Sequence, residues 1–206
     1  MTIMFHLNAF SAIANRSLWI PEYLEIIERT LDLSLAQFNR VCVLRFDLRF
    51  PESEQYCDPK VISRFIDSFK AHITPWDRQR ASEHPIGFGY VWCREKETSQ
   101  NWHYHVAFVF NKDAVCGFGQ TVFGRSNTYN RILKAWASAI GVPVDNAIGL
   151  VHVCENGVYW LDRNSDEFPL QYQAVMQRCS YLAKAATKDI YDGCRNIGSS
   201  QQLFMG

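Results

Sequence analysis

The sequence predicts an α+β fold in which helices flank a central, mainly antiparallel sheet. Segments whose apolar residues recur at helical spacing alternate along the chain with segments whose apolar residues recur at every second position. Two strand-like segments are also consecutive, joined by a short polar stretch. A chain of 206 residues with 48% hydrophobic content can build one core. We expect residues 1–206 to form a single domain, with an N-terminal helical extension over 1–39, a core over 40–190 and a tail over 191–206.

The first half of the chain is predicted to form a helix, a strand and a second helix. Residues 20–38 carry apolar side chains at helical spacing, and Pro21 suits the first helical turn. Residues 41–51 alternate between an apolar and a polar face, which predicts a strand that ends at Pro51. Residues 59–73 return to helical spacing. The polar face of the strand carries Arg45, Asp47 and Arg49.

The second half of the chain adds a hairpin, two helices and a further strand. Residues 86–95 and 104–110 read as strands, and the polar stretch between them predicts an antiparallel hairpin. Gly141 is typical of a helix C-terminus. The remaining segments are a helix over 127–141, a strand over 148–157 and a last helix over 169–191.

Composition excludes some functional classes and leaves the partner open. Basic and acidic residues balance at 21 each, which argues against a coat protein for long nucleic acids but not against a local basic face. Seven scattered cysteines without a C-x-x-C pair argue against a zinc ribbon and a secreted disulfide framework. No apolar run reaches the roughly 20 residues of a membrane span, and the N-terminus lacks a signal-peptide pattern. We therefore expect a cytoplasmic protein without a membrane partner.

Two histidines, His103 and His105, lie two residues apart and so share one face of a strand. Two imidazoles can bind a divalent metal ion, and a site acting on phosphates also needs an oxygen ligand and open positions. Glu95, on the preceding strand of the hairpin, is the best-placed carboxylate. Asp47 is a further candidate, although an ordinary salt bridge to a flanking arginine explains it as well. The pair alone is a weak motif, so two structural histidines remain an alternative.

The last helix carries a tyrosine and a lysine, Tyr181 and Lys184, at a spacing that places them on one face. Gln177 and Lys188 extend that face by one turn in either direction. An amphipathic tyrosine at the core margin is the alternative interpretation. An unperturbed tyrosine, with a pKa of about 10, is a weak nucleophile at neutral pH. A nearby ammonium favours the phenolate and a metal polarises a phosphate, so the combination suits phosphodiester transesterification.

Four stretches, VLRFDLRFP, VWCRE, HYHVAFVFN and SYLAK, occur in the order seen in a known group of enzymes. They resemble the HUH endonucleases of rolling-circle replication and plasmid mobilisation, and most of all the YagK/YfjJ-type domain of inovirus-type phage and prophage replication proteins. The resemblance spans roughly residues 40–190 and implies a five-stranded antiparallel sheet with flanking helices. It also implies Mg²⁺ or Mn²⁺ as cofactor. The site residues it implies are His103, His105 and Glu95 for the metal, Tyr181 as nucleophile and Lys184 beside it.

The activity implied by the resemblance is strand-specific nicking and rejoining of single-stranded or hairpin DNA at a replication origin. The DNA 5′ end would be held as a phosphotyrosine, and the reaction would start rolling-circle replication of a phage or mobile element inside a bacterial host cell. Tyr191 lies ten residues after Tyr181, too far to match the second tyrosine of two-tyrosine relatives, which favours a single nucleophile. No helicase-like segment follows, so we expect host or phage helicases and replication proteins as partners.

Several further residues have weaker assignments, and two other functions stay open. A non-catalytic module that binds origin DNA is one alternative, and an accessory protein with structural histidines is another. The intact H-x-H and Y-x-x-K patterns favour the nuclease. His152, in an apolar strand, is predicted to be a core histidine. Asp47 and Gln177 are candidates for supporting the site. Candidate phosphate contacts, each of which can also be a solvated surface residue, are Arg45, Arg49, Arg94, Arg178 and Lys188.

Overall fold

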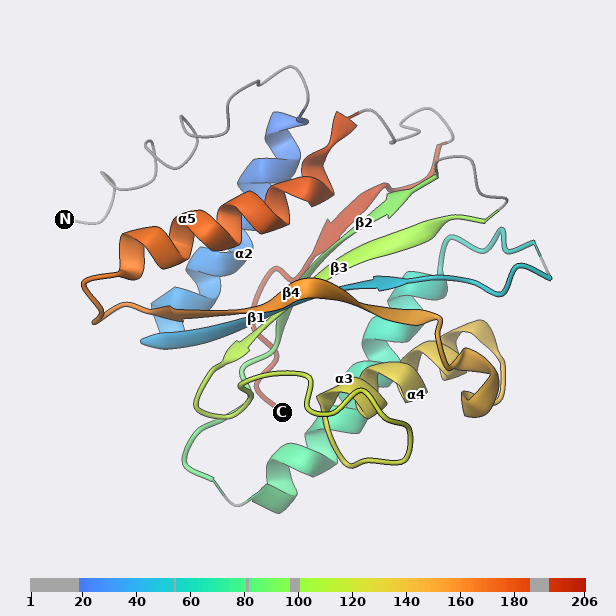
Figure 1. Cartoon of the computed structure of the whole chain (residues 1–206), viewed down its shortest axis with the longest axis horizontal. Helices are drawn as coiled ribbons and strands as arrows, with labels where there is room; N and C mark the ends of the chain where they lie inside the picture. The colour runs from blue at the N-terminus through green and yellow to red at the C-terminus, as the bar shows by residue number, and fades with distance from the viewer. Residues whose placement is uncertain (1–18, 54, 81, 97–100, 186–192) are drawn as a thin grey trace.

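A computed structural model describes the chain over residues 19–53, 55–80, 82–96, 101–185 and 193–206. In Figure 1, helices α2 and α5 lie on one side of a sheet and helices α3 and α4 lie on the other. The helices are α2 (Pro21–Gln37), α3 (Val61–Arg80), α4 (Thr128–Ile140) and α5 (Phe168–Cys179), with short 3-10 helices η2 (Val144–Ala147) and η3 (Ser180–Ala183). The strands are β1 (Arg40–Leu48), β2 (Gly89–Glu95), β3 (His103–Asn111), β4 (Val151–Asp162) and β5 (Ile197–Ser199).

The sheet has five strands in the order β4-β1-β3-β2-β5, and every neighbouring pair is antiparallel. This arrangement confirms the predicted α+β class and the five-stranded antiparallel sheet. The fifth strand lies within the segment 191–206, which was expected to be a tail. That expectation was wrong for β5, which pairs with β2, and for Phe204, which pairs with Phe88.

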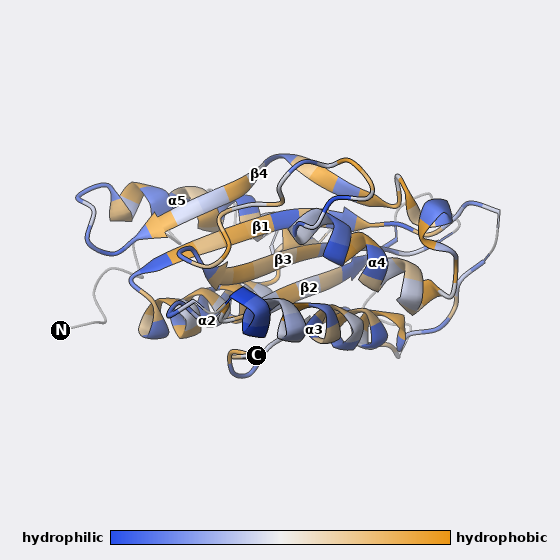
Figure 2. Ribbon diagram, turned by 90° about the horizontal axis from the view of Figure 1, so that it is seen from below, coloured by the Kyte–Doolittle hydropathy of each residue, from blue (hydrophilic) through white to orange (hydrophobic). Residues whose placement is uncertain are grey.

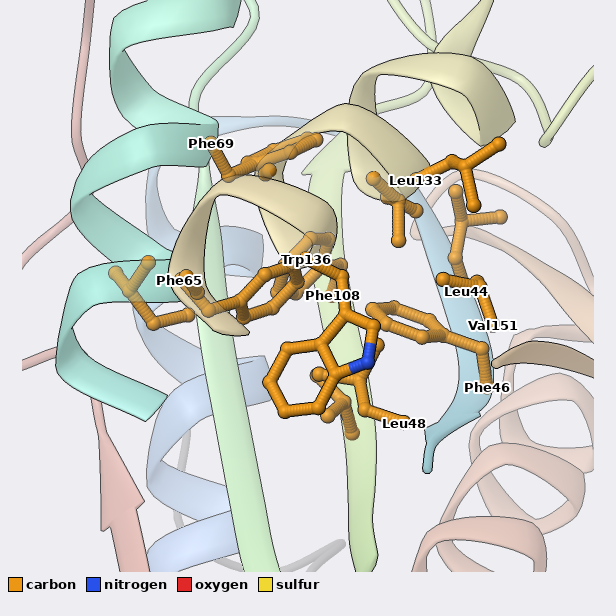
Figure 3. Packing of buried hydrophobic residues seen from close by; sticks show 14 of the residues in the cluster. Leu44, Phe46, Leu48, Phe65, Phe69, Phe108, Leu133, Trp136 and Val151 are labelled. Carbon is orange, nitrogen blue, oxygen red and sulfur yellow. The ribbon is translucent and has the colours of Figure 1, made fainter. Parts of the chain in front are cut away.

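One face of the sheet packs on α3 and α4 through aromatic side chains. The apolar face of β1 supplies Phe46, whose ring lies edge-on to Phe108 of β3 at a centroid distance of 4.9 Å. Figure 3 shows Phe65 of α3 and Trp136 of α4 gathered around these two rings. The indole N–H of Trp136 donates to the carbonyl of Arg49 at 2.7 Å. In Figure 2, hydrophobic residues concentrate along β1, β3 and β2, as a core covered on both faces requires.

The opposite face of the sheet packs on α2 and α5. Val41 and Val43 of β1 are buried there, in one cluster with residues of both helices. Arg45 and Asp47 continue the same face and are also buried, at 2% and 8% exposure. The sequence therefore predicted correctly that Arg45 and Asp47 share one face of β1. That face is covered by helices, so the two side chains are buried and not exposed to solvent.

Two of the predicted helices differ in length from the observed ones. α3 continues past the expected end at residue 73 to Arg80 and includes Pro75. The last helix is shorter than predicted over its described part, because the α-helix ends at Cys179 and one 3-10 turn, η3, follows. α4 matches its prediction, with the side chain of Asn127 capping its start and Gly141 its end at a φ of 76°.

β4 is longer than predicted because it contains a bulge. Leu44 and Phe46 of β1 pair with Val158 and Val153, so β4 has the four residues 154–157 where β1 has only Arg45. The sequence Asn156-Gly157 suggested the end of the strand, yet the strand continues beyond it to Asp162.

Over the described ranges, no helix has both the length and the apolar character needed to cross a membrane.

Candidate metal and tyrosine site

The hairpin of β2 and β3 brings the three predicted metal ligands together. Glu95 pairs with His103 across the hairpin, and His105 lies on the same face two residues further along β3. One ligand atom from each residue lies within 4.8 Å of the other two. Glu95 is fully buried, His105 is 5% exposed and His103 is half-buried. The carboxylate Oε2 of Glu95 contacts Nε2 of His105 and lies 4.0 Å from Nε2 of His103.

These three side chains fit a divalent ion. Ligand atoms that share an ion at about 2.1 Å each lie at most about 4 Å apart, so small rotations of the side chains bring all three donors to one ion. Two imidazoles and one carboxylate form a mixed nitrogen and oxygen set that leaves positions open for a phosphate. Mg²⁺ prefers oxygen ligands, so the two imidazoles distinguish this donor set from a typical Mg²⁺ site.

Asp47 holds His105 from the side opposite to Glu95. The two residues are paired in the register of β1 and β3, and Oδ1 of Asp47 accepts a hydrogen bond from Nδ1 of His105 at 2.6 Å. Nη1 of Arg45 donates to the same carboxylate oxygen at 2.5 Å. Nη2 of Arg45 also lies 2.8 Å from Nδ1, but two N–H donors do not bond each other, so the carboxylate is the partner of both. The lone pair of Nε2 is thereby directed toward Glu95 and the ion position.

The charge of Asp47 is stabilised by its neighbours. Burial raises the pKa of this carboxyl, but the hydrogen bond from His105 and the positive charge of Arg45 outweigh burial and hold the pKa well below its ordinary value. Asp47 was predicted to be either a supporting residue or a salt-bridge partner of a flanking arginine. It is in contact with both Arg45 and His105.

Tyr181 lies beside this cluster although it is far away in sequence. Its ring meets the ring of His105 edge-on, with centroids 5.2 Å apart and planes at 84°. The side chain is 38% exposed. The ammonium of Lys184 lies over the tyrosine ring, 5.5 Å from its centroid. In a 3-10 turn residues i and i+3 eclipse each other, so the predicted pairing of Tyr181 with Lys184 is kept without an α-helix.

The 3-10 turn η3 holds Tyr181 outward because its other residues are anchored. Ser180, Leu182 and Ala183 are buried. The hydroxyl of Ser180 donates to the carbonyl of Gln177 at 2.8 Å, and the carbonyl of Ala183 accepts from the backbone N–H of Ile20 at 2.8 Å. Tyr181 is therefore an exposed phenol on an anchored turn, as a nucleophile requires.

Tyr181 and the two histidines open into a cleft of about 1080 Å³. Residues of β1 and the segment after it, of β4 and of the last turn of α5 also line this cleft. Its lining also includes the charged and polar side chains of Arg49, Glu52, Asn101, His152, Glu155, Asn156 and Arg178.

The predicted DNA contacts divide into residues at the cleft and residues elsewhere. Arg49 is exposed and Arg178 is half-buried, and both line the cleft. Arg45 also lines the cleft, but its guanidinium is buried and binds Asp47 and the carbonyl of Phe46. Arg94 is not among the described lining residues of the cleft. It lies on the other face of the sheet, where it donates to Oδ1 of Asn196 at 2.7 Å and stacks 4.1 Å from the Trp102 ring centroid.

Two other candidates are not among the described lining residues of the cleft, and one residue was missed. Gln177 is exposed outside the cleft lining, and Lys188 lies outside the described residues. His152 was predicted to be a core histidine, but it is exposed and lines the cleft. The alternation of Val151, His152 and Val153 carried the signal, because it places the histidine on the opposite face from the valines.

Comparison with known proteins gives the chain a family. Residues 4–200 match the YagK/YfjJ C-terminal domain. The chain belongs to this family. Two relatives from Escherichia coli (strain K12), the uncharacterized proteins YfjJ and YagK, are each 33% identical to it. The aligned regions cover 87% and 88% of this chain and 93% of each relative. No solved structure shows significant similarity to the chain.

Proposed function

We propose that this member of the YagK/YfjJ family is an HUH-type endonuclease that nicks and rejoins single-stranded DNA through Tyr181. The observation that supports this most directly is the edge-on contact of Tyr181 with His105, 5.2 Å between centroids. A phosphate bound at the ligand cluster would lie within reach of the phenol oxygen. That oxygen bonds to phosphorus, the bond from phosphorus to the 3′ oxygen breaks, and the freed 3′ hydroxyl receives the proton that the phenol gives up.

The ligand cluster supplies the electrostatic part of this proposal. A divalent ion held by Glu95, His103 and His105 would polarise the scissile phosphate and offset the negative charge that develops on it. Asp47 fixes the ring orientation and tautomer of His105, and Arg45 keeps Asp47 ionised and in place. We propose Mn²⁺ or Mg²⁺ as the ion, with Mn²⁺ favoured by the two imidazoles.

Lys184 and the cleft arginines complete the assignment. The ammonium of Lys184 lies over the Tyr181 ring and would offset negative charge on the phenol oxygen as it attacks phosphorus. Arg49, Arg178 and His152 line the cleft and would contact phosphates next to the scissile one. Since the chain has a formal net charge of zero, its affinity for DNA should come from these three cleft residues and not from a broad basic surface.

The biological role that fits such a reaction is initiation of rolling-circle replication at the origin of a phage or other mobile element. A 5′-phosphotyrosine conserves the energy of the broken bond, so the same active site can rejoin the strand after one round of copying. Single-stranded or hairpin DNA is the substrate, and a helicase of the bacterial host or the phage would unwind the duplex.

The decisive experiment is capture of the covalent intermediate. Purified protein is incubated with Mn²⁺ and a labelled pool of single-stranded DNA of random sequence, and the mixture is separated on a denaturing gel. We expect a labelled protein–DNA adduct that is absent with Tyr181→Phe and absent when a chelator replaces Mn²⁺. Tyr159→Phe is the matched control, because Tyr159 lines the same cleft and its variant should form the adduct normally.

The same gel distinguishes the nuclease from a module that only binds DNA. A binding module would shift labelled DNA on a native gel but give no adduct under denaturing conditions. An adduct that survives Tyr181→Phe would show that another residue is the nucleophile, and full activity without metal would remove the role given to the histidines.

A further inference from the structure

The bulge of β4 is the most unusual backbone feature beside the candidate active site. Residues 154–157 occupy the space opposite Arg45 alone. Glu155 and Asn156 are exposed and line the same cleft as Tyr181. Asn156 has a φ of 51° and is the single non-glycine residue with a positive φ in the part of the chain that the structure describes. Bulges of this kind often redirect side chains near active sites.

The bulge is held in place by close backbone contacts. A Cβ atom on Gly157 would lie 2.6 Å from the carbonyl oxygen of Arg45 and 2.7 Å from that of Cys154, so only glycine fits there. Nη2 of Arg178 donates to the carbonyl of Glu155 at 3.1 Å. Asn156 therefore projects from a supported position and not from a loose loop.

Arg45 connects the bulge to the ligand cluster. Its carbonyl packs against Gly157, and its guanidinium binds Asp47, which in turn binds His105. Arg45 thus links Gly157, the residue next to Asn156, to Asp47, the residue that orients His105. A side chain that reads a neighbouring nucleotide needs a fixed position of this kind.

The chemistry of the bulge suits a base and not a phosphate. The carboxylate of Glu155 repels phosphates, whereas Arg49 and Arg178 in the same cleft attract them. An exposed asparagine amide offers one acceptor and a donor group side by side, a pattern that matches the N7 and N6 edge of adenine. A strand with its phosphates on the arginines would therefore turn a base toward Asn156.

We propose that Asn156 reads one base close to the nicked bond, with adenine as the preferred base, and that the β4 bulge is the specificity element of the cleft. This inference rests on the proposed nicking activity. A paired amide contact of this type discriminates against other bases by about tenfold or more.

The test uses the adduct reaction with a random single-stranded pool, followed by sequencing of the DNA that is linked to the protein. The wild type should show adenine enriched about tenfold or more at one position near the nick. Asn156→Gly keeps the left-handed backbone and removes the amide, so enrichment at that position should disappear while the total amount of adduct is retained. Asn156→Asp keeps the shape but only accepts hydrogen bonds, and should shift the preference toward cytosine.

Asn164→Gly is the matched control, because Asn164 is an exposed asparagine outside the cleft lining and its variant should keep the wild-type preference. The inference is wrong if the wild type shows no base preference near the nick. It is also wrong if both Asn156 variants keep the wild-type preference for adenine. In either case the nuclease assignment still stands. If the wild type forms no adduct with any sequence, the proposed function and this inference both fail.

Discussion

Asp47 and His105 face each other on β1 and β3, and Oδ1 of the carboxylate accepts the Nδ1–H of the imidazole at 2.6 Å. Arg45 binds the same oxygen, so the three side chains form one buried unit behind the ligand cluster. Residues that orient a metal ligand in this way typically contribute roughly 10- to 100-fold to metal affinity. The role of this unit can be measured separately from any reaction on DNA.

The first prediction is that Asp47→Asn weakens Mn²⁺ binding by roughly 10- to 100-fold. The neutral amide binds Nδ1–H less strongly and no longer attracts Arg45, so the ring of His105 loses its fixed orientation. Titration calorimetry with Mn²⁺ measures the effect. Asp58→Asn is the control, because Asp58 pairs with Arg64 at an exposed position away from the cluster and should leave the affinity unchanged. Equal affinity of wild type and Asp47→Asn would contradict the assigned role.

The second prediction concerns the stability of the metal-free protein in acid. The pKa of Asp47 is lowered in the folded chain, so its contribution to the free energy of unfolding is present above the ordinary value of 3.8 and is lost as the pH falls below it. Asp47→Asn should lower the free energy of unfolding by about 3 kcal/mol at pH 7, because Arg45 loses its buried partner. Urea unfolding at several pH values should show the difference narrowing below pH about 4. A difference that stays constant over this range would rule out the ion pair as its source.

The strand pattern of the sequence predicted most of the sheet because burial on one face enforces alternation. β1 and the β2–β3 hairpin were predicted for this reason, and the hairpin register brought Glu95 to the histidines. The alternation could not show that α2 and α5 cover the second face, so Arg45 was interpreted as a surface residue. Burial of that face depends on helices distant in sequence, which a local pattern does not report.

Three features of the fold depend on tertiary contacts that leave little local signal. β5 has three residues and no alternation, and it forms only because β2 offers a free edge. The helical spacing of the last segment continues past Cys179, where the structure changes to a 3-10 turn. Asn156-Gly157 is a strong turn signal, yet pairing with β1 resumes after it. The second and third of these differences both lie at the candidate site.

The third prediction separates the metal ligands from the other cleft histidine. His103→Ala and Glu95→Gln should abolish Mn²⁺ binding and the DNA adduct together, because each removes one of three donors. His152→Ala should bind Mn²⁺ like the wild type and lower the affinity for single-stranded DNA several-fold, since His152 lines the cleft outside the cluster. Loss of Mn²⁺ binding in His152→Ala would place this residue among the ligands.

The fourth prediction is that Lys184→Met slows adduct formation roughly 100-fold in a single turnover. The ammonium lies 5.5 Å from the centre of the Tyr181 ring, and its removal leaves the attacking phenol oxygen without a nearby positive charge. Affinity for Mn²⁺ should not change, because Lys184 is not one of the three ligands Glu95, His103 and His105. Lys184→Arg should recover part of the rate. If Lys184→Met forms the adduct at the wild-type rate, phenol activation must come from elsewhere.

The fifth prediction concerns the bulge of β4. Gly157→Ala places a methyl group against the backbone oxygens of Arg45 and Cys154, and main-chain atoms cannot rotate away as a flexible side chain can. We expect the free energy of unfolding to fall by about 1–3 kcal/mol, as for other over-packed buried sites. Gly117→Ala is the matched control, because no atom lies within 4 Å of the added Cβ and the backbone φ there suits alanine.

The metal affinity of Gly157→Ala then tests whether the bulge and the ligand cluster are connected. A shift of the Arg45 backbone should disturb its guanidinium, and through Asp47 the orientation of His105, so Mn²⁺ binding should weaken relative to Gly117→Ala. A variant that is destabilised but binds Mn²⁺ with the wild-type affinity would show that the strain stays in β4. In that case Arg45 holds the bulge and the imidazole independently, and the distance between Asn156 and the cluster would not depend on it.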